Sequence, residues 1–187
     1  MNAAHLRIKN CFLLLSLFVC IPLLTPIGEV LARDLLADML DMYIPEMKDL
    51  RVNAGENNYG NMMTESPRRK PTNQDVFRHT AGFTYGVFGE SPVDFMYQQN
   101  GIIYGDPESV KDMVAVRLPK MPLLYQSGTR WVYSVSHDVQ AYLVEYFSGM
   151  GFAEYLHKTI LDPLGMTDIF FGVPDEFVDR YTANYGP

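Results

Sequence analysis

One tyrosine in this sequence stands where it could act as a general base. Tyr133 lies in the segment 126–134, Gln-Ser-Gly-Thr-Arg-Trp-Val-Tyr-Ser, three residues after Arg130. A phenol, whose pKa is ordinarily about 10, accepts a proton near neutral pH only beside a positive charge that lowers this pKa. Arg130 could supply that charge, or its guanidinium could face a carboxylate elsewhere. Taken alone, a tyrosine that follows Trp131 and precedes an amphipathic helix is more often a packing residue than a catalytic one.

The other candidate residues make a weaker case for chemistry. Ser136, His137 and Asp138 are consecutive, and they cannot converge on one atom because successive helical residues point about 100° apart. We predict that Ser136 caps a helix. Ser134 is a candidate nucleophile only because it adjoins Tyr133, and His79 is expected to be structural. The sequence has no Gly-x-Ser-x-Gly elbow, no His-Glu-x-x-His and no phosphate-binding glycine loop, so we expect neither a metal nor a cofactor.

Several helices are predicted to position these residues. A short helix is expected over residues 34–42, followed by an irregular surface segment over residues 53–73. A second helix begins near Asp106 and Pro107 and ends near Pro119. Apolar residues at helical spacing predict a third helix from Ser136 to Gly149 and a fourth from residue 152 to 162.

Composition limits the class of protein. The chain has 187 residues, 48% of them hydrophobic, which is enough for one globular domain with a core. Its net charge of −7 makes nucleic acid an unsuitable partner, because phosphate binding needs a basic surface. The basic run 68–70, Arg-Arg-Lys, lies between two prolines and is expected to be a solvated turn.

The N-terminus has the pattern of an export signal. Basic residues precede an apolar run at 11–24, and residues 30–32, Val-Leu-Ala, fit a signal peptidase site. We therefore expect residues 1–32 to be a signal peptide and the protein to be periplasmic or secreted. The apolar run could instead associate with a membrane as an uncleaved anchor. Both cysteines, Cys11 and Cys20, lie in this leader, so the mature chain would carry no thiol.

Four segments resemble, in the same order, motifs of the beta-lactamase-like serine hydrolases, which include class C beta-lactamases, penicillin-binding proteins and related carboxylesterases. They are residues 43–46 (Tyr-Ile-Pro-Glu), 76–86 around the His-Thr-Ala-Gly sequence, 126–134, and 161–167 (Leu-Asp-Pro-Leu-Gly-Met-Thr). The resemblance covers roughly residues 35–187. It implies an α/β fold of the beta-lactamase/transpeptidase type, with residues 33–187 forming part of that domain, mainly its helical subdomain with little of the sheet.

The same resemblance implies roles for particular residues. Tyr133 would be the general base, and Arg130, Ser134 and Val135 would lie at the binding site. The sequence departs from the family where the nucleophile should be, because it contains neither the Ser-x-x-Lys pair nor the Lys-Thr-Gly-like element. Val135 also replaces the asparagine of a Tyr-x-Asn motif, and an aliphatic side chain cannot make that amide's hydrogen bonds. This favours esters over beta-lactams as substrates.

Two functions remain open from the sequence. The protein could be a serine hydrolase that acts on small ester or beta-lactam-like substrates once the missing elements are supplied, and that is inactive as this chain alone. It could instead be an exported, non-catalytic pseudoenzyme fragment or binding module. The sequence does not identify a protein partner.

Overall fold

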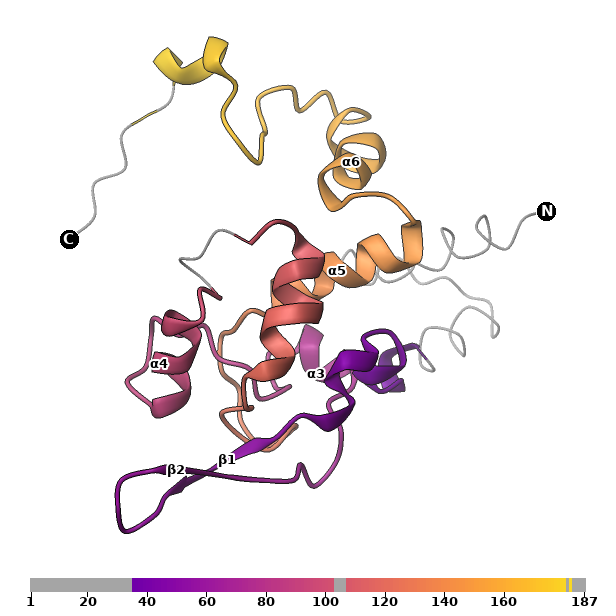
Figure 1. The fold of residues 1–187 in the computed structure, drawn as a ribbon. Helices are drawn as coiled ribbons and strands as arrows, with labels where there is room; N and C mark the ends of the chain where they lie inside the picture. The colour runs from indigo at the N-terminus through magenta and orange to yellow at the C-terminus, as the bar shows by residue number, and fades with distance from the viewer. Residues whose placement is uncertain (1–34, 103–106, 181, 183–187) are drawn as a thin grey trace. The chain divides into compact units, whose positions relative to one another are not determined.

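A computed structural model describes residues 35–102, 107–180 and 182 of the chain (Figure 1). Its contacts divide the chain into two units, residues 1–149 and residues 150–187. The predicted leader 1–32, its apolar run 11–24 and the helix-capping Asp106 lie outside the described residues. Export and membrane association therefore stay predictions. Within the part of the chain that is described, no helix is both long and apolar enough to cross a membrane.

The first unit is built mainly from short helices. In chain order its elements are η1 (Leu40–Met42), η2 (Pro45–Asp49), β1 (Val52–Glu56), β2 (Met62–Glu65), α3 (Asn73–Phe77), α4 (Pro92–Gln99), η3 (Asp112–Arg117), η4 (Leu118–Lys120) and α5 (Ser136–Ser148). Among the described residues the strands form one two-stranded antiparallel hairpin. This composition confirms the predicted helical subdomain with little sheet.

The helix predicted over residues 34–42 is interrupted. Residues 35–37 are helical and η1 follows, but Asp38 is a bend and Met39 is extended against the start of α3. The Asp38 carbonyl accepts the Asn73 N–H at 3.0 Å, and Met39 forms a β-bridge with Thr72. Pairing with a distant segment therefore replaces the helical hydrogen bonds at this point, which local periodicity could not indicate.

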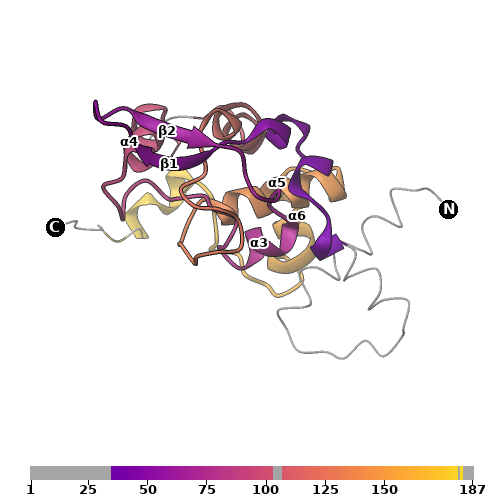
Figure 2. The same ribbon diagram turned by 90° about the horizontal axis from the view of Figure 1, so that it is seen from below.

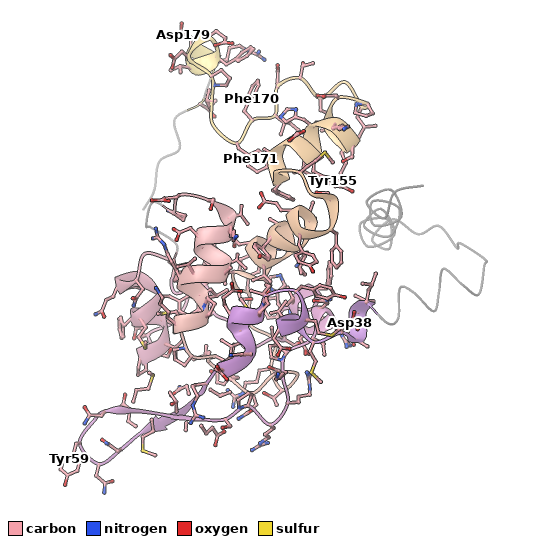
Figure 3. All side chains as sticks on the ribbon, turned by 45° about the vertical axis from the view of Figure 1, so that its right-hand side comes forward. Asp38, Tyr59, Tyr155, Phe170, Phe171 and Asp179 are labelled. Carbon is pink, nitrogen blue, oxygen red and sulfur yellow. The ribbon has the colours of Figure 1, made fainter. Side chains whose placement is uncertain are left out.

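The prediction of an irregular segment over residues 53–73 was wrong, because β1 and β2 occupy much of it (Figure 2). The turn is stabilised by Asn57, whose side-chain oxygen accepts the N–H groups of Tyr59 and Asn61 at 2.9 and 3.0 Å. Tyr59 is 88% exposed at the tip of the hairpin (Figure 3). Since nearly all hairpin residues beyond Val52 are exposed on both faces, no alternation of apolar and polar residues marks these strands in the sequence.

The basic run 68–70 is not the solvated turn that we expected. The Arg69 guanidinium makes two hydrogen bonds to the buried Asp75 carboxylate, at 2.5 and 2.8 Å, and Lys70 pairs with Asp41. Asp75 also forms a capping box with Thr72 at the start of α3. Burial acts to raise the pKa of Asp75, but the bonds from Arg69 and Thr72 outweigh it and hold the pKa below its ordinary value.

The longest helix of the first unit follows the predicted pattern. α5 runs from Ser136 to Ser148, ends at Gly149 in the left-handed conformation, and packs against α3. Its buried Val139 and Leu143 join a core that also contains Leu40, Ile44, Val76, Phe83, Tyr97, Val114, Leu118, Leu123 and Val135. The prediction that Ser136 caps α5 was wrong. Val135 is the capping residue, and Ser136 is the first helical residue, fully buried.

The helix predicted from Pro107 to near Pro119 is present, but it begins later than predicted, at Val110, because residues 107–109 are not helical. Its π-helical part η3 leads directly into η4, which contains Pro119.

The second unit contains the last predicted helix. α6 (Phe152–Leu156) continues into the π-helical η5 (His157–Leu161), which Asp162 ends. The 3-10 helix η6 (Asp175–Arg180) follows. Phe170 and Phe177 stack at 5.1 Å between ring centroids, and Arg180 pairs with Asp168 at 2.5 Å.

Replacement of Arg69 by alanine tests the ion pair at the start of α3. At pH 7 we expect the free energy of unfolding to fall by about 1–2 kcal/mol. This is the contribution of a charged hydrogen-bonded pair, reduced because Arg69 is half-exposed to solvent. Because the pKa of Asp75 is depressed in the folded state, this stabilisation is present above the ordinary carboxyl pKa of about 3.9. It is lost as the pH falls through the folded-state value.

Urea denaturation of Arg69→Ala and wild type, at pH 7 and at decreasing pH, measures this effect. Arg68→Ala is the matched control, because Arg68 is the exposed neighbour, and it should change stability by less than about 0.5 kcal/mol. Equal losses in the two variants, or a loss in Arg69→Ala that stays constant as Asp75 becomes protonated, would contradict the assignment.

Candidate active site around Tyr133

Two of the motif segments recognised in the sequence are joined by hydrogen bonds in the first unit. Carbonyl groups of residues 79–84 accept N–H groups of residues 124–135 along most of their length. The backbone bonds are Leu124 N–H to Gly82 O at 2.7 Å, Gly128 N–H to Thr80 O at 2.7 Å, Val132 N–H to His79 O at 2.9 Å and Val135 N–H to Thr84 O at 3.3 Å. The Ser127 hydroxyl adds a bond to Ala81 O at 2.9 Å. We call this paired region the motif seam.

Glycines make the close approach in the motif seam possible. Gly82 has a φ of +99°, and a Cβ atom there would clash with the backbone carbonyl oxygen of Tyr125. Gly128, at φ +81°, has the Arg69 guanidinium against it, so a Cβ there would displace that guanidinium. The Arg69–Asp75 pair therefore stabilises the start of α3 and also packs on the segment that leads to Tyr133.

Tyr133 emerges from the motif seam into a group of aromatic side chains. Tyr133 is 41% exposed. The ring stacks on His79 at 4.9 Å between centroids, with an angle of 25° between the planes. Tyr85, His137 and Phe88 lie at 5.5, 5.9 and 6.1 Å from it. Together with Trp131, which lies 6.1 Å from His79, these residues form what we call the aromatic cluster.

Among the described residues, the Arg130 guanidinium pairs with neither the Tyr133 phenol nor a carboxylate. Its guanidinium carbon lies 4.4 Å from the centre of the Tyr125 ring, in a cation–π contact. Arg130 is exposed and remains at the surface of the segment predicted to bind a ligand. Its charge is directed at Tyr125, so the lowered phenol pKa that general-base chemistry requires would need another cation.

Ser134 and Val135 lie in the interior of the first unit. Their exposed fractions are 1% and 0%, and Val135 belongs to the hydrophobic core. Both were predicted to line a binding site, but neither presents surface to a ligand in this structure. The Ser134 hydroxyl lies 2.8 Å from that of Ser136 and 3.3 Å from His79 Nδ1.

The contact between Ser134 and His79 resembles a serine–histidine pair but cannot serve as one in this arrangement. The Ser134 backbone N–H donates to His79 Nδ1 at 3.2 Å, and a neutral imidazole nitrogen has a single acceptor site. The hydroxyl is also too buried for a substrate to reach. Burial, with a smaller effect from His137, lowers the pKa of His79 below its ordinary value, so the ring is neutral at pH 7.

The consecutive Ser136, His137 and Asp138 diverge, as helix geometry predicts. Ser136 is fully buried, His137 is exposed beside Tyr133, and Asp138 is half-buried, which raises the pKa of its carboxyl group. Among the described residues no group of three histidine, cysteine or acidic side chains could hold a metal ion.

A hollow in the second unit is lined by Asp168, Phe170, Val173, Phe177 and Arg180. Its arginine and aspartate neutralise each other, and it holds no serine or tyrosine.

Sequence reasoning missed three members of the aromatic cluster. Tyr85 and Phe88 follow the His-Thr-Ala-Gly segment, and His137 was considered only as part of a consecutive triad. A signal for Tyr85 was available, since it lies in the matched segment 76–86. Phe88 and His137 approach Tyr133 only through the tertiary fold.

Comparisons with known proteins agree with the family resemblance. A sequence model of the family described as Beta-lactamase matches residues 32–187, a range that contains all four motif segments. Lovastatin esterase from Penicillium rubens is 29% identical over 132 residues, which are 71% of this chain and 32% of that protein. Monacolin J acid methylbutanoyltransferase from Aspergillus terreus is 26% identical over 136 residues, 73% of this chain and 32% of that protein.

Simvastatin Synthase (LovD) from Aspergillus terreus shares the fold, with a TM-score of 0.56 at 22% identity. The match covers 88% of this chain and 36% of that one. The chain therefore spans about a third of the length of the relatives that it matches.

Alanine at Gly82 tests the close approach in the motif seam. Gly55 offers a matched control, because its φ of +88° is similar but a Cβ there meets nothing within 4 Å. Both variants should lose about 1–2 kcal/mol of unfolding free energy through left-handed strain. Gly82→Ala should lose about 1–3 kcal/mol more, because the added methyl group overpacks the motif seam. Urea denaturation compares the two, and equal losses would show that the seam is not closely packed there.

Proposed function

This chain belongs to the Beta-lactamase family, and we propose that it supplies the general base of a serine acyl-transfer site that prefers esters. The observation that carries the proposal is the placement of Tyr133. The motif seam holds its backbone, while its phenol reaches the surface within the aromatic cluster. Related proteins named an esterase and an acyltransferase match this chain over most of its length, which supports acyl transfer as the reaction class.

The proposed reaction proceeds through a serine ester. The Tyr133 oxygen takes the proton from a serine hydroxyl as that hydroxyl attacks the carbonyl carbon of the ester. The proton then passes to the departing alcohol. In the second half Tyr133 takes a proton from water, the hydroxide adds to the acyl-enzyme, and the acid leaves as the serine regains its proton. Backbone N–H groups would stabilise the oxyanion in both halves.

Neither the serine nor the activating cation is supplied by the described residues around Tyr133. Ser134 and Ser136 are buried, and Arg130 is directed at Tyr125. A Ser-x-x-Lys pair would provide both groups, and this sequence contains none. We therefore propose that this chain does not form an acyl-enzyme by itself.

The surroundings of Tyr133 support an uncharged, apolar ester as the substrate. The neighbouring groups are the rings of Tyr85 and Phe88 and two imidazoles, that of His79, which is neutral at pH 7, and that of His137. Val135 is an aliphatic residue of the core, and it has no amide group that could bond to a beta-lactam side chain. The name of the Penicillium rubens relative, lovastatin esterase, points in the same direction.

The alternative, a non-catalytic binding module, is favoured by the exposed rings beside Tyr133. Trp131 and Phe88 are 66% and 76% exposed, and exposed aromatic groups are frequent at interaction sites.

A fluorophosphonate probe tests whether the chain alone has an activated serine. We expect no stoichiometric adduct from the folded 187-residue protein, as judged by intact mass and peptide mapping. An adduct on one serine would overturn the proposed inactivity and would identify the nucleophile. A mapped adduct on Ser134 would further show that the interior of the first unit opens.

Replacement of Tyr133 by phenylalanine tests the general base. The assay requires a form of the protein that carries a Ser-x-x-Lys pair. Hydrolysis of a p-nitrophenyl ester by that form should fall by about 100-fold or more in kcat, the usual contribution of a general base. Tyr59→Phe, at the exposed hairpin tip, is the control and should keep full activity. Full activity in Tyr133→Phe would exclude the proposed role.

A further inference from the structure

The end of α3 contains a histidine in a backbone conformation that usually belongs to glycine. His79 has a φ of +55°, and it is the one residue besides glycine with a positive φ among those described. The Thr80 N–H bonds to Asp75 O at 2.8 Å and the His79 N–H to Val76 O at 3.2 Å. These are the bonds of a Schellman motif, whose left-handed position is normally glycine because it has no Cβ. Strain of this kind, kept at a particular side chain, indicates that the side chain has a role.

His79 makes contacts on both sides of Tyr133 in the sequence. Its carbonyl oxygen accepts the Val132 N–H at 2.9 Å, and its Nδ1 accepts the Ser134 N–H at 3.2 Å. The two residues that flank Tyr133 are therefore both bonded to His79. The imidazole also stacks on the phenol ring, at 4.9 Å between centroids. One residue thus restrains both the backbone and the side chain of the proposed base.

The two side-chain contacts use the imidazole ring of His79. Accepting the Ser134 N–H requires an unprotonated Nδ1, which places the ring proton on Nε2. Stacking on the phenol requires a planar ring. Glycine would satisfy the backbone of the Schellman motif better than histidine does, so the end of the helix does not explain why histidine is present.

We propose that His79 is a positioning residue for Tyr133, which it holds by accepting the Ser134 N–H and by stacking on the phenol. The proposal rests on the proposed function, since positioning serves catalysis only if Tyr133 is the base. A phenol held in one orientation is ready to take the proton of an attacking hydroxyl, whereas a mobile side chain must first be ordered. His79 touches neither substrate nor reacting atoms in this role.

Two substitutions separate the two contacts. His79→Gly removes both and relieves the left-handed strain, so its urea midpoint should stay close to that of the wild type. His79→Asn is tolerated in the left-handed conformation, and its side-chain oxygen can accept the Ser134 N–H, but it has no ring. Arg78→Ala is the control, because Arg78 is the exposed neighbour that ends α3.

Nuclear magnetic resonance of the 187-residue chain, with ¹³C-labelled tyrosine rings, measures both contacts without turnover. In His79→Gly the Tyr133 ring signals should move towards their unfolded positions, and Ser134 amide exchange should be roughly tenfold faster, as for one lost hydrogen bond. In His79→Asn the ring signals should move while the exchange rate stays within about twofold of wild type. Arg78→Ala should leave both quantities unchanged. Tyr133→Phe assigns the ring signals.

The proposal is overturned if folded His79→Gly keeps either the wild-type Tyr133 ring signals or the wild-type exchange of Ser134. If His79→Gly does not fold, the asparagine variant decides, and unchanged ring signals in that variant overturn the proposal. These outcomes are independent of the activity test. Failure of Tyr133→Phe to lower activity would refute the general base but not the contacts, whereas unchanged signals would refute the positioning but not the base.

Discussion

The pairing of residues 79–84 with residues 124–135 is the interaction on which the first unit and its candidate site depend. These segments are about 50 residues apart in the sequence, and their backbone bonds bring together the end of α3 and the start of α5. Phe83, Leu124 and Val135 are buried along them. Each buried N–H and C=O group must find a partner, so the motif seam satisfies the backbone while its side chains fill the core. Tyr133 reaches the surface because its neighbours on either side are held in this way.

The motif seam in turn depends on charges that the sequence does not show to be paired. Asp75 is buried at the start of α3, where it receives bonds from Arg69, Thr72 and Thr80. A buried carboxylate is tolerated only with such partners. Arg69 also lies over Gly128. One ion pair therefore supports the start of α3, the helix that His79 follows, and also the loop that precedes Tyr133.

Local patterns predicted the helices well and the contacts between segments poorly. α5 and the helix that begins at Phe152 have apolar residues at helical spacing and clear stops, so both were predicted from the sequence alone. The hairpin was missed because it is exposed on both faces, and Arg69 was misread because its partner is defined by the tertiary fold. The motif resemblance included both of the paired segments among its four, but it contained no information on which segments meet or on their hydrogen bonds. The left-handed backbone of His79 could not be predicted, because the sequence has histidine at a position where glycine would have indicated that conformation.

The need for a stable fold accounts for the buried residues of the first unit but not for the exposed residues around Tyr133. Buried residues such as Val135 and Leu124 would be retained in any protein that keeps this core. The exposed Trp131 and Phe88 bury little apolar area, and the left-handed His79 carries strain. Such features persist when a ligand or a reaction uses them. Because an ester substrate and a non-catalytic ligand would use the aromatic rings in the same way, the rings do not separate the two functions. What separates them is whether the Tyr133 hydroxyl is required, since a general base needs the hydroxyl, whereas a binding module that uses only the ring does not.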